Sequence, residues 1–424
     1  MSPKLLSMIK NQELPKEQIT KDIASGMIVA IIALPLSIAL AISSGLTPEK
    51  GLITAIIAGL AISILGGSKV QIGGPTATFV VIIYEVVQKH GMSGLIISTM
   101  LAGIILIIMG LLKFGTLIKY VPKTITVGFT SGIAVTLLIT QFKDLFGLDI
   151  TKLPTQSIKK IETYIANLET FDILTFGVGI LCIILMLLWP KFNKKIPGSI
   201  IALVVASVLV KVFNMEIDTI GSIHFEIVSS IPIPKIPKIN MDIIKELIEP
   251  SFTIAILAAI QALLSCAVAD EMLGEKHDSN TELIAQGIGN IGSALFGGMP
   301  ATGAVARTVL NVKNSGRSPI SGIVHCLTLL FVMMFMTSFT KLIPMTVLSS
   351  ILIIVSFNMG DWKGMKDMMS LHITDVIVLL STFTLTIMFD LITAISVGMI
   401  LHIIFIYVRK LQYKAYNMKV EEAI

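Results

Sequence analysis

The chain has 424 residues, of which 54% are hydrophobic and 14% are charged, whereas soluble domains carry roughly 25% charged residues. Too few polar residues are present to cover a folded soluble protein, which excludes a cytosolic enzyme, a nucleic-acid-binding protein and a disordered scaffold. The formal net charge of +5 does not indicate nucleic-acid binding, because the lysines fall at the ends of apolar runs and not in one patch. The composition predicts an all-α integral membrane protein that has the lipid bilayer as a partner.

Apolar segments recur along the chain at the spacing of membrane spans. A spanning helix needs about 20 apolar residues, and residues 23–48, 91–112 and 318–340 contain no Asp, Glu, Lys or Arg. We predict fourteen spans, an even number that places both termini on one side of the membrane. The predicted spans are 24–44, 51–67, 75–88, 93–112, 124–142, 172–190, 197–213, 250–269, 282–297, 301–313, 319–340, 344–359, 374–389 and 390–409.

Lysines in the short loops predict the orientation. Positive charges concentrate in short cytoplasmic loops, and with both termini inside, the short outer loops carry only Lys50, Lys89 and Lys341. Residues 1–22 are polar and show no cleavable signal peptide. We therefore expect a multi-pass cell-membrane protein with cytoplasmic termini. The lysines of the short inner loops are Lys113, Lys119, Lys123, Lys191, Lys194 and Lys195.

The two longest loops have distinct patterns. In 143–171, residues Ile158, Ile161, Ile165 and Leu168 repeat at helical spacing, which predicts a helix lying on the outer surface. Residues 215–249 alternate and then become proline-rich, which predicts an extended connector between two halves. The predicted organisation is a cytoplasmic segment 1–22, a first repeat 23–214, the extracellular connector 215–249, a second repeat 250–409 and a cytoplasmic tail 410–424.

Two short motifs occur twice in the chain. Gly73-Gly74-Pro75-Thr76-Ala77-Thr78 recurs with one insertion as Gly297-Gly298-Met299-Pro300-Ala301-Thr302, and the prolines are 225 residues apart. Lys119-Tyr120-Val121-Pro122-Lys123-Thr124 resembles Lys341-Leu342-Ile343-Pro344-Met345-Thr346 at an offset of 222 residues. The similar offsets predict a duplicated unit of seven spans. Because seven is odd, the second copy must enter from the opposite side, which makes a 7+7 inverted repeat, common in secondary transporters.

The glycine pairs and the prolines after them predict two half-helices that begin within the membrane. Helices from Pro75 to about Val87 and from Pro300 to about Val312 would be roughly 20 Å long, too short to span. Inverted symmetry would point their N-termini at each other, and free N–H groups and helix dipoles would make the gap an anion site. The alternative is a pair of proline-kinked helices packed through small residues. The expected half-helix starts are Gly73, Gly74 and Pro75, and Gly297, Gly298 and Pro300, with hydroxyl donors from Thr76, Thr78 and Thr302.

Arg307 lies within the second predicted half-helix. An ionisable residue in a membrane span is costly and indicates a functional site, and the guanidinium stays charged at any accessible pH. We expect it to raise the positive potential near the anion site. The alternative is an arginine that extends to the cytoplasmic interface.

At these residues the sequence resembles the sulfate permease (SulP) family of anion transporters, which includes the animal prestin and pendrin proteins. The resemblance covers about residues 18–410 and is most specific in the last of four stretches. The stretches are Ala33-Leu34-Pro35-Leu36-Ser37; Gly73 to Phe79; Val268-Ala269-Asp270 with His277 and Ser279-Asn280; and Gln286-Gly287-Ile288-Gly289-Asn290 through Gly297 to Arg307-Thr308.

The resemblance implies a uracil-permease-like membrane domain and a homodimer. Spans 1–4 and 8–11 would form a mobile core, and spans 5–7 and 12–14 a gate. The core would move like an elevator and carry an anion between spans 3 and 10. Carried over by position, the anion site comprises Leu36, Leu40, Thr76, Ala77, Thr78, Phe79, Ala301, Thr302, Gly303 and Arg307.

The chain departs from the family pattern in two places. Gln261, one turn before Ser265, stands where many bacterial members have an acidic residue that serves cation or proton coupling. This makes sodium or proton symport doubtful, and we take Gln261 and Ser265 as the coupling position. The Gln261 amide has two interpretations: a bond to substrate or to span 1, or a bond to a neighbouring helix carbonyl. The family usually continues into a cytosolic STAS domain, and we expect this chain to be the membrane domain without it.

The sequence therefore predicts a secondary active transporter of small anions such as sulfate, bicarbonate, chloride or dicarboxylates. The alternatives are an uncoupled anion channel or uniporter through the same site, a protein of this fold with a structural or sensory role, and a nucleobase permease. Nucleobase permeases of this fold normally use acidic residues on spans 8 and 10, where this chain has Gln261 and Ala or Gly. We expect no enzyme activity, no cofactor and no metal site, because nucleotide-binding, hydrolase and metal-ligand motifs are lacking.

Overall fold

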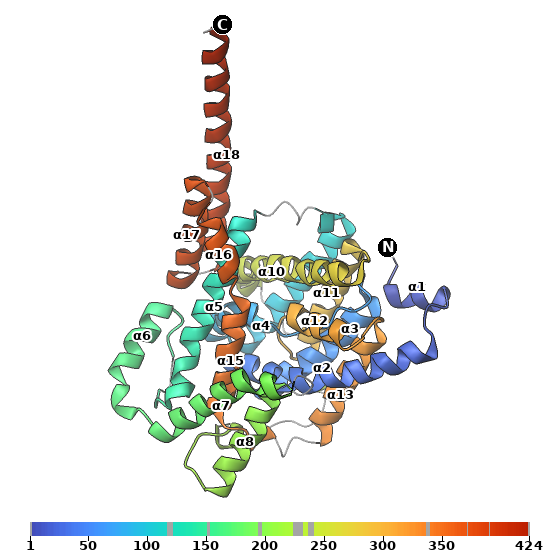
Figure 1. The fold of residues 1–424 in the computed structure, drawn as a ribbon, viewed down its shortest axis with the longest axis vertical. Helices are drawn as coiled ribbons and strands as arrows, with labels where there is room; N and C mark the ends of the chain where they lie inside the picture. Colours follow the sequence, from blue (N-terminus) through green and yellow to red (C-terminus); the bar gives the residue numbers. More distant parts are fainter. Residues whose placement is uncertain are drawn as a thin grey trace.

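The computed structural model describes residues 2–116, 122–150, 153–193, 197–223, 232–235, 241–335, 340–370, 372–389 and 391–422. For 241–243, 391–392 and 410–422 only the backbone is described. These residues are mostly helical (Figure 1), and the two short strands among them are β1 (Gly73–Gly74) and β2 (Thr302–Gly303).

Seven helices pack mainly on one another and form the first helix group. Both glycine-rich segments of the sequence repeat connect helices of this group. Helix α11 packs along α4 and α3, α13 packs along α2 and α3, and α10 packs on α4 and α12. The members are α2 (Lys16–Ser43), α3 (Pro48–Leu65), α4 (Val80–Leu111), α10 (Met241–Leu273), α11 (Ser279–Leu295), α12 (Val305–Lys313) and α13 (Ile320–Phe335).

Six further helices form the second helix group. Helix α5 packs on α15 and α17, α7 packs on α8 and α15, and α18 packs on α17. The two groups meet where α5 approaches α4 and where α2 approaches α15. The members are α5 (Lys123–Phe146), α7 (Ile173–Phe192), α8 (Gly198–Val212), α15 (Met345–Met359), α17 (Ile373–Met388) and α18 (Leu391–Glu422).

Short helices and 3-10 turns complete the fold. The predicted amphipathic helix is present as α6 (Ser157–Ala166), which exposes Ile158, Ile161 and Ile165 and ends before Leu168. The others are α1 (Lys4–Lys10), α9 (Ile220–Ile223), α16 (Trp362–Met368) and the 3-10 turns η1 (Ala77–Phe79), η2 (Phe114–Thr116) and η4 (Leu168–Thr170).

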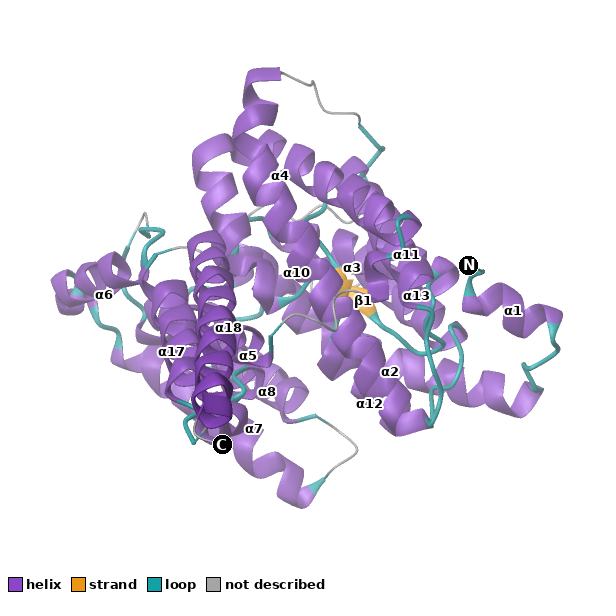
Figure 2. Ribbon diagram, turned by 90° about the horizontal axis from the view of Figure 1, so that it is seen from above, coloured by secondary structure: helices purple, strands orange, loops and turns teal. Residues whose placement is uncertain are grey.

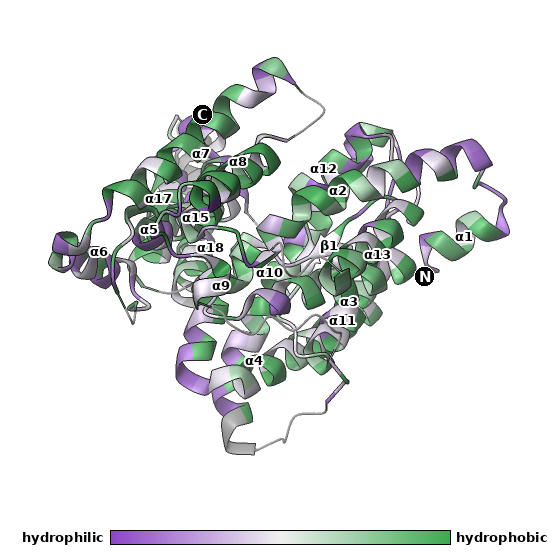
Figure 3. Cartoon of the chain, turned by 90° about the horizontal axis from the view of Figure 1, so that it is seen from below, coloured by the Kyte–Doolittle hydropathy of each residue, from purple (hydrophilic) through white to green (hydrophobic). Residues whose placement is uncertain are grey.

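The exposed surface of the long helices is apolar. In the part of the chain that the structure describes, seven helices are long and apolar enough to cross a membrane, and four shorter apolar helices accompany them. Residues such as Leu187 of α7 (59%) and Val208 of α8 (53%) are exposed, and Figure 3 shows long stretches of the helices coloured as hydrophobic. Such surfaces suit lipid rather than water, as expected for a multi-pass membrane protein.

The predicted helix starts at Pro75 and Pro300 are wrong. After Pro75 the chain stays extended at Thr76 and begins to coil only at Ala77, and the second helix, α12, begins at Val305. The reason is that β1 ends directly before Pro75 and β2 begins two residues after Pro300, so the backbone groups of these strand residues are bonded between segments and not along a helix. The predicted break between spans 3 and 4 is a kink at Gly91 of α4, where φ is +64°.

The connector and the second half begin differently from the prediction. Helix α10 starts at Met241, so Pro250 lies inside the helix and not at its first turn. The connector is therefore not extended throughout, and it also contains α9. Asp390, where the last predicted span begins, and Lys119 of the second repeated motif lie outside the described residues.

The strands β1 and β2 cross in the interior of the first helix group (Figure 2). They pair antiparallel, with Gly73 opposite Gly303 and Gly74 opposite Thr302. Gly303 has no room for a side chain, because a Cβ there would lie 1.3 Å from Nε2 and 2.4 Å from Cδ of Gln71.

We expect Gly303→Ala to destabilise the protein strongly. The whole Gln71 amide would have to move and lose its bond to the Ala262 carbonyl, and overpacking of a core typically costs about 1–3 kcal/mol. Thermal unfolding in detergent should show a lowered midpoint. Gly177→Ala is the matched control, since nothing lies within 4 Å of its Cβ position and alanine favours a helix. Equal unfolding midpoints for the two variants would contradict the close packing of Gly303 against Gln71 at the strand crossing.

Candidate anion site

The extended residues before α12 receive their hydrogen bonds from side chains of neighbouring helices. The Asn290 amide of α11 donates to the Ala301 carbonyl at 2.8 Å and accepts from the Ala301 N–H at 2.9 Å. The Met299 N–H donates to Thr54 Oγ1 at 2.7 Å, and Ser293 Oγ donates to the Met299 carbonyl at 2.8 Å. Buried backbone groups must be paired, so these side chains hold the non-helical segment in place.

Thr308 secures the other side of the crossing. Its Oγ1 accepts from the Ile72 N–H at 3.1 Å and from Ser265 Oγ at 3.0 Å. The Ala304 N–H donates to the Ile72 carbonyl at 2.9 Å. Ser265, half of the predicted coupling position, is therefore a buried residue that ties α10 to α12.

Thr302, predicted as a hydroxyl donor to the anion, points to α10 instead. Its Oγ1 donates to the Ala258 carbonyl at 2.7 Å and the residue is fully buried. Gln71 Nε2 donates to the Ala262 carbonyl at 3.3 Å, one turn along α10. Both side chains fasten the crossing to the same helix.

Arg307 is buried against the lead-in to α4. Its Nη2 donates to the Pro75 carbonyl, and the side chain is only 3% exposed, so the alternative of an arginine that extends to the membrane interface is wrong. Its Nε and Nη1 have no partner, and no acidic side chain lies within ion-pair distance, among the described residues. Gly74 makes this approach possible, because a Cβ there would lie 2.5 Å from Nη1.

A small cavity of about 50 Å³ lies beside the start of α4, between the two helix groups. The room exceeds the roughly 10–15 Å³ that one water needs. Next to it, Thr76 Oγ1 donates to Gln261 Oε1 at 3.2 Å, so Gln261 ties α10 to the lead-in of α4. The polar lining residues are Thr78, Thr126, Thr130 and Gln261, and the apolar ones are Ile125, Phe129, Leu257, Ile260, Leu264 and Ile395.

Several predicted site residues pack around the cavity without lining it. Ala77 is buried in one apolar cluster with Leu40, against which Leu36 packs. Phe79 is fully buried in a second cluster with Met299. The remaining predicted residues, Gly297, Gly298 and Pro300, form the turn after α11, where Gly297 has a φ of +69°.

Sequence reasoning missed the residues that α5 contributes. Thr126 and Thr130 line the cavity from the second helix group, and Asn290, Thr54 and Gln71 support the crossing. A polar residue inside an apolar span indicates a site, but the sequence does not show which neighbouring helix that residue faces.

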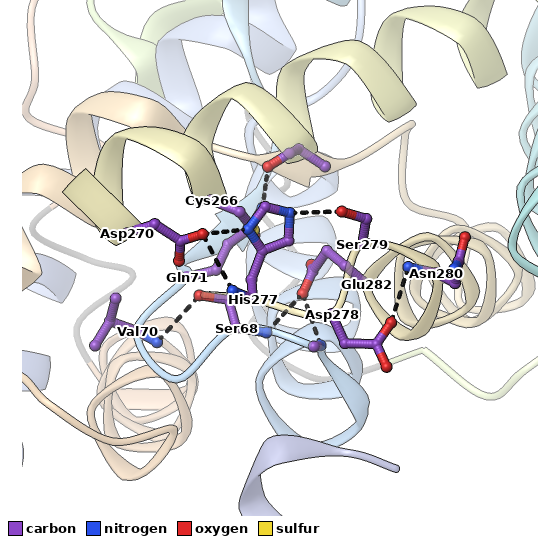
Figure 4. A network of polar contacts seen from close by, with 12 residues as sticks. Ser68, Val70, Gln71, Cys266, Asp270, His277, Asp278, Ser279, Asn280 and Glu282 are labelled. Carbon is purple, nitrogen blue, oxygen red and sulfur yellow. Dashed lines mark hydrogen bonds and ion pairs between the residues drawn. The ribbon is translucent and has the colours of Figure 1, made fainter. Parts of the chain in front are cut away.

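A polar network ties the α10–α11 loop to the segment that leads into β1 (Figure 4). His277 Nδ1 lies 2.6 Å from Asp270 Oδ2, and its Nε2 lies 2.9 Å from Ser279 Oγ. Buried Glu282 accepts from the N–H groups of Gly67 at 2.9 Å and Ser68 at 3.2 Å. The resembling stretch around Asp270, His277 and Ser279 thus forms one connected network.

Comparisons with known proteins agree on one family. The model of the sulfate permease family matches residues 19–382. YvdB of Bacillus subtilis, a protein named for sulfate transport, is 38% identical over 93% of this chain and 74% of its own length. The bicarbonate transporter BicA of Picosynechococcus is 32% identical over 89% of this chain and 68% of its own length.

Solved structures show the same fold. The transmembrane domain of a cyanobacterial bicarbonate transporter BicA superposes with a TM-score of 0.81 at 27% identity, covering 90% of this chain and 98% of that domain. SLC26A9 superposes with a TM-score of 0.86 at 20% identity, covering 96% of this chain and 68% of that protein. Together with the family match, these likenesses establish that the chain belongs to the sulfate permease family.

Proposed function

We propose that the chain is a secondary active transporter of small anions that works by an elevator-type movement. The observation that carries the proposal is the cavity at the start of α4. Its lining is shared between the two helix groups, with Thr78 and Gln261 on one and Thr126 and Thr130 on the other. A displacement of one group along the other would carry an anion held at the α4 start across the membrane.

The same groups support the proposed 7+7 inverted repeat. Strand β1, which is Gly73–Gly74 of the first copy of the glycine motif, pairs antiparallel with β2, which contains Thr302 at the end of the second copy. The prolines of the second motif, Pro122 and Pro344, both stand directly before a helix of the second group, α5 and α15. We take the first group as the mobile core and the second as the gate, with both termini in the cytoplasm of a cell-membrane homodimer.

Electrostatics favour an anion as the substrate. Arg307 carries a buried charge that no acidic residue compensates among the described residues. Unit charges several ångströms apart interact by a few kcal/mol at an effective dielectric constant of about 20. The free N–H groups at the start of η1 and α4 add a positive dipole end. Sulfate, bicarbonate, chloride and small dicarboxylates fit this chemistry, and the relatives are named for sulfate and bicarbonate.

Uptake of labelled anions by proteoliposomes tests the proposal. Uptake of one or more of these anions that saturates and shows counterflow supports a transporter. Linear, non-saturating flux that follows the membrane potential would favour the uncoupled channel. Uptake of uracil in place of anions would favour a nucleobase permease.

Arg307→Gln should weaken anion binding, and sulfate should lose more affinity than formate because a divalent anion interacts more strongly with the lost charge. Competition between each anion and labelled substrate gives the two affinities. Arg317→Gln is the matched control, since Arg317 is exposed near the end of α12. Equal affinities in Arg307→Gln and wild type would show that the charge does not act on the site.

Thr130→Phe should abolish uptake while the protein remains folded. Thr130 is partly exposed and lines the cavity, so the ring would occupy the space of the anion and not the packed core. Uptake and the thermal unfolding midpoint should be measured together. Ile108→Phe serves as the control, because Ile108 is 48% exposed on the outward side of α4. Normal transport by Thr130→Phe would place the anion elsewhere.

Uptake by the wild type should be independent of a sodium gradient. A cation in the membrane interior needs a negative partner, and Gln261 cannot ionise. Gln261→Glu should make uptake depend on pH, with faster uptake at lower pH, because a buried carboxylate beside the anion must be neutralised. The measurement is uptake with and without sodium and proton gradients at clamped membrane potential. A several-fold stimulation of the wild type by either gradient would contradict the role given to Gln261.

A further inference from the structure

Lys160 of α6 is a buried cation at the boundary of the two helix groups. Although the neighbouring residues Ile158 and Ile161 are exposed, Lys160 is only 3% exposed. Its Nζ donates to Thr140 Oγ1 of α5 at 2.8 Å and lies 5.6 Å from the ring centroid of Tyr84 of α4. Among the described residues, no carboxylate lies within ion-pair distance of it.

The contact joins parts that the proposed movement must separate. Tyr84 belongs to the first helix group, and its hydroxyl donates to the Leu153 carbonyl at 2.5 Å, in the segment between α5 and α6. Helix α6 is fixed to the second group, because Tyr164 donates to the Ile139 carbonyl of α5 at 3.0 Å. Lys160 and Tyr84 therefore meet across the boundary.

Burial makes this contact sensitive to the charge on Lys160. Loss of hydration lowers the pKa of Lys160 to about 8, whereas a hydrated lysine titrates near 10.4. When the contact opens, the amine is hydrated and has the higher of these two pKa values. At a pH between the two pKa values, the open state therefore binds more protons than the closed state. Rising pH through this window therefore favours the closed contact.

We propose that Lys160 acts as a brake: deprotonation of its amine tightens the contact between α6 and α4, and transport slows as pH rises on the side of the membrane where α6 lies. The proposal rests on the proposed function, because a contact between the two groups restrains transport only if the groups move. Lys160 is thus a positioning residue that need not touch the anion.

Other ionisable groups nearby do not supply the same switch. Burial, with smaller contributions from Asp144 and Tyr84, raises the pKa of Tyr164, so its hydroxyl stays protonated in this window. On α4, Glu85 pairs with Lys89 at 2.6 Å. The other charged or titratable residues on elements packed against α6 are Lys123, Lys143 and Asp144 of α5, Glu169 of η4, and Asp375 of α17, which pairs with Arg409 at 2.8 Å.

Three variants separate charge from packing. Lys160→Met keeps much of the length and removes the charge, so it should behave as the deprotonated form at every pH. The arginine of Lys160→Arg stays charged above pH 9, so the contact between α6 and α4 should not tighten as pH rises. Lys159→Met is the matched control, because Lys159 is the exposed neighbour on the same helix. Monodisperse elution and an unchanged thermal midpoint confirm that each variant folds.

Spin labels attached to the variant Gln88→Cys/Glu162→Cys measure the contact directly by pulsed electron resonance at pH 7, 8 and 9. Both sites are exposed, and the native Cys182, Cys266 and Cys326 are buried. In the wild type and in Lys159→Met, the population at the short distance divided by the population at the long distance should rise about fivefold from pH 8 to pH 9. It should stay constant and high in Lys160→Met, and constant and low in Lys160→Arg.

Sulfate uptake measured in parallel should fall as pH rises in the wild type and remain level in Lys160→Arg. Sulfate keeps its charge over this pH range. A ratio that does not change with pH in the wild type, or that rises equally in Lys160→Arg, would overturn the brake. The distances are measured without an anion gradient, so they decide on the brake alone. Absence of uptake of every anion by the wild type would overturn the proposed function.

Discussion

Backbone hydrogen bonding at the crossing of β1 and β2 is the constraint on which the rest of the structure depends. In the interior of a membrane protein an unpaired backbone group costs several kcal/mol, so a non-helical chain is tolerated only where protein supplies the partners. The two strands pair with each other, and Asn290, Thr54 and Thr308 bond the flanking backbone groups. Most polar side chains near the crossing are thereby committed to structure.

Because the nearby polar side chains are already bonded to the backbone, the charge of Arg307 can have two roles. Arg307 donates to the Pro75 carbonyl and so fixes the backbone directly before η1 and α4. Its charge is not neutralised by that bond, since a carbonyl is a dipole and no carboxylate is near among the described residues. The field of the guanidinium therefore extends to the start of α4, where the side chains of Thr78 and Gln261 line the cavity. In the proposed mechanism, Arg307 acts on the anion through space, behind the backbone that it holds.

The sequence predicts the helical membrane fold and the location of the special segments better than their conformation. The two repeated glycine segments are predicted to approach each other, and β1 (Gly73–Gly74) pairs with β2 (Thr302–Gly303), a few residues beyond the second segment. The helix starts predicted at Pro75 and Pro300 are wrong, since coiling begins only at Ala77 and at Val305. Strand pairing between residues some 230 positions apart leaves no local periodicity in either segment. Thr302 was expected in the anion site for its residue type, yet whether its hydroxyl faces a cavity or the Ala258 carbonyl depends on the packing of a third helix.

The cavity itself shows a second limit of sequence reasoning. Thr126 and Thr130 of α5 lie on either side of Gly128, but their span has no Gly-Gly pair followed by proline. Their pattern is therefore that of any span with a few threonines. Only the approach of α5 to α4 makes them part of a site. The family resemblance located residues on the first helix group because its motifs are concentrated there, and it gave no position on the second.

The crossing and the cavity differ in how they are distributed over the two groups. Every residue that bonds the β1–β2 backbone belongs to the first group or to the segments within it, so that unit can move without losing an internal hydrogen bond. The cavity takes its threonines from both groups, and its lining must change whenever the groups shift. An anion held by Arg307 and the start of α4 would keep its main electrostatic partners during such a shift and exchange only the hydroxyl and apolar contacts of α5. A carrier needs both properties: a part that holds the ion unchanged and a part that the ion can leave.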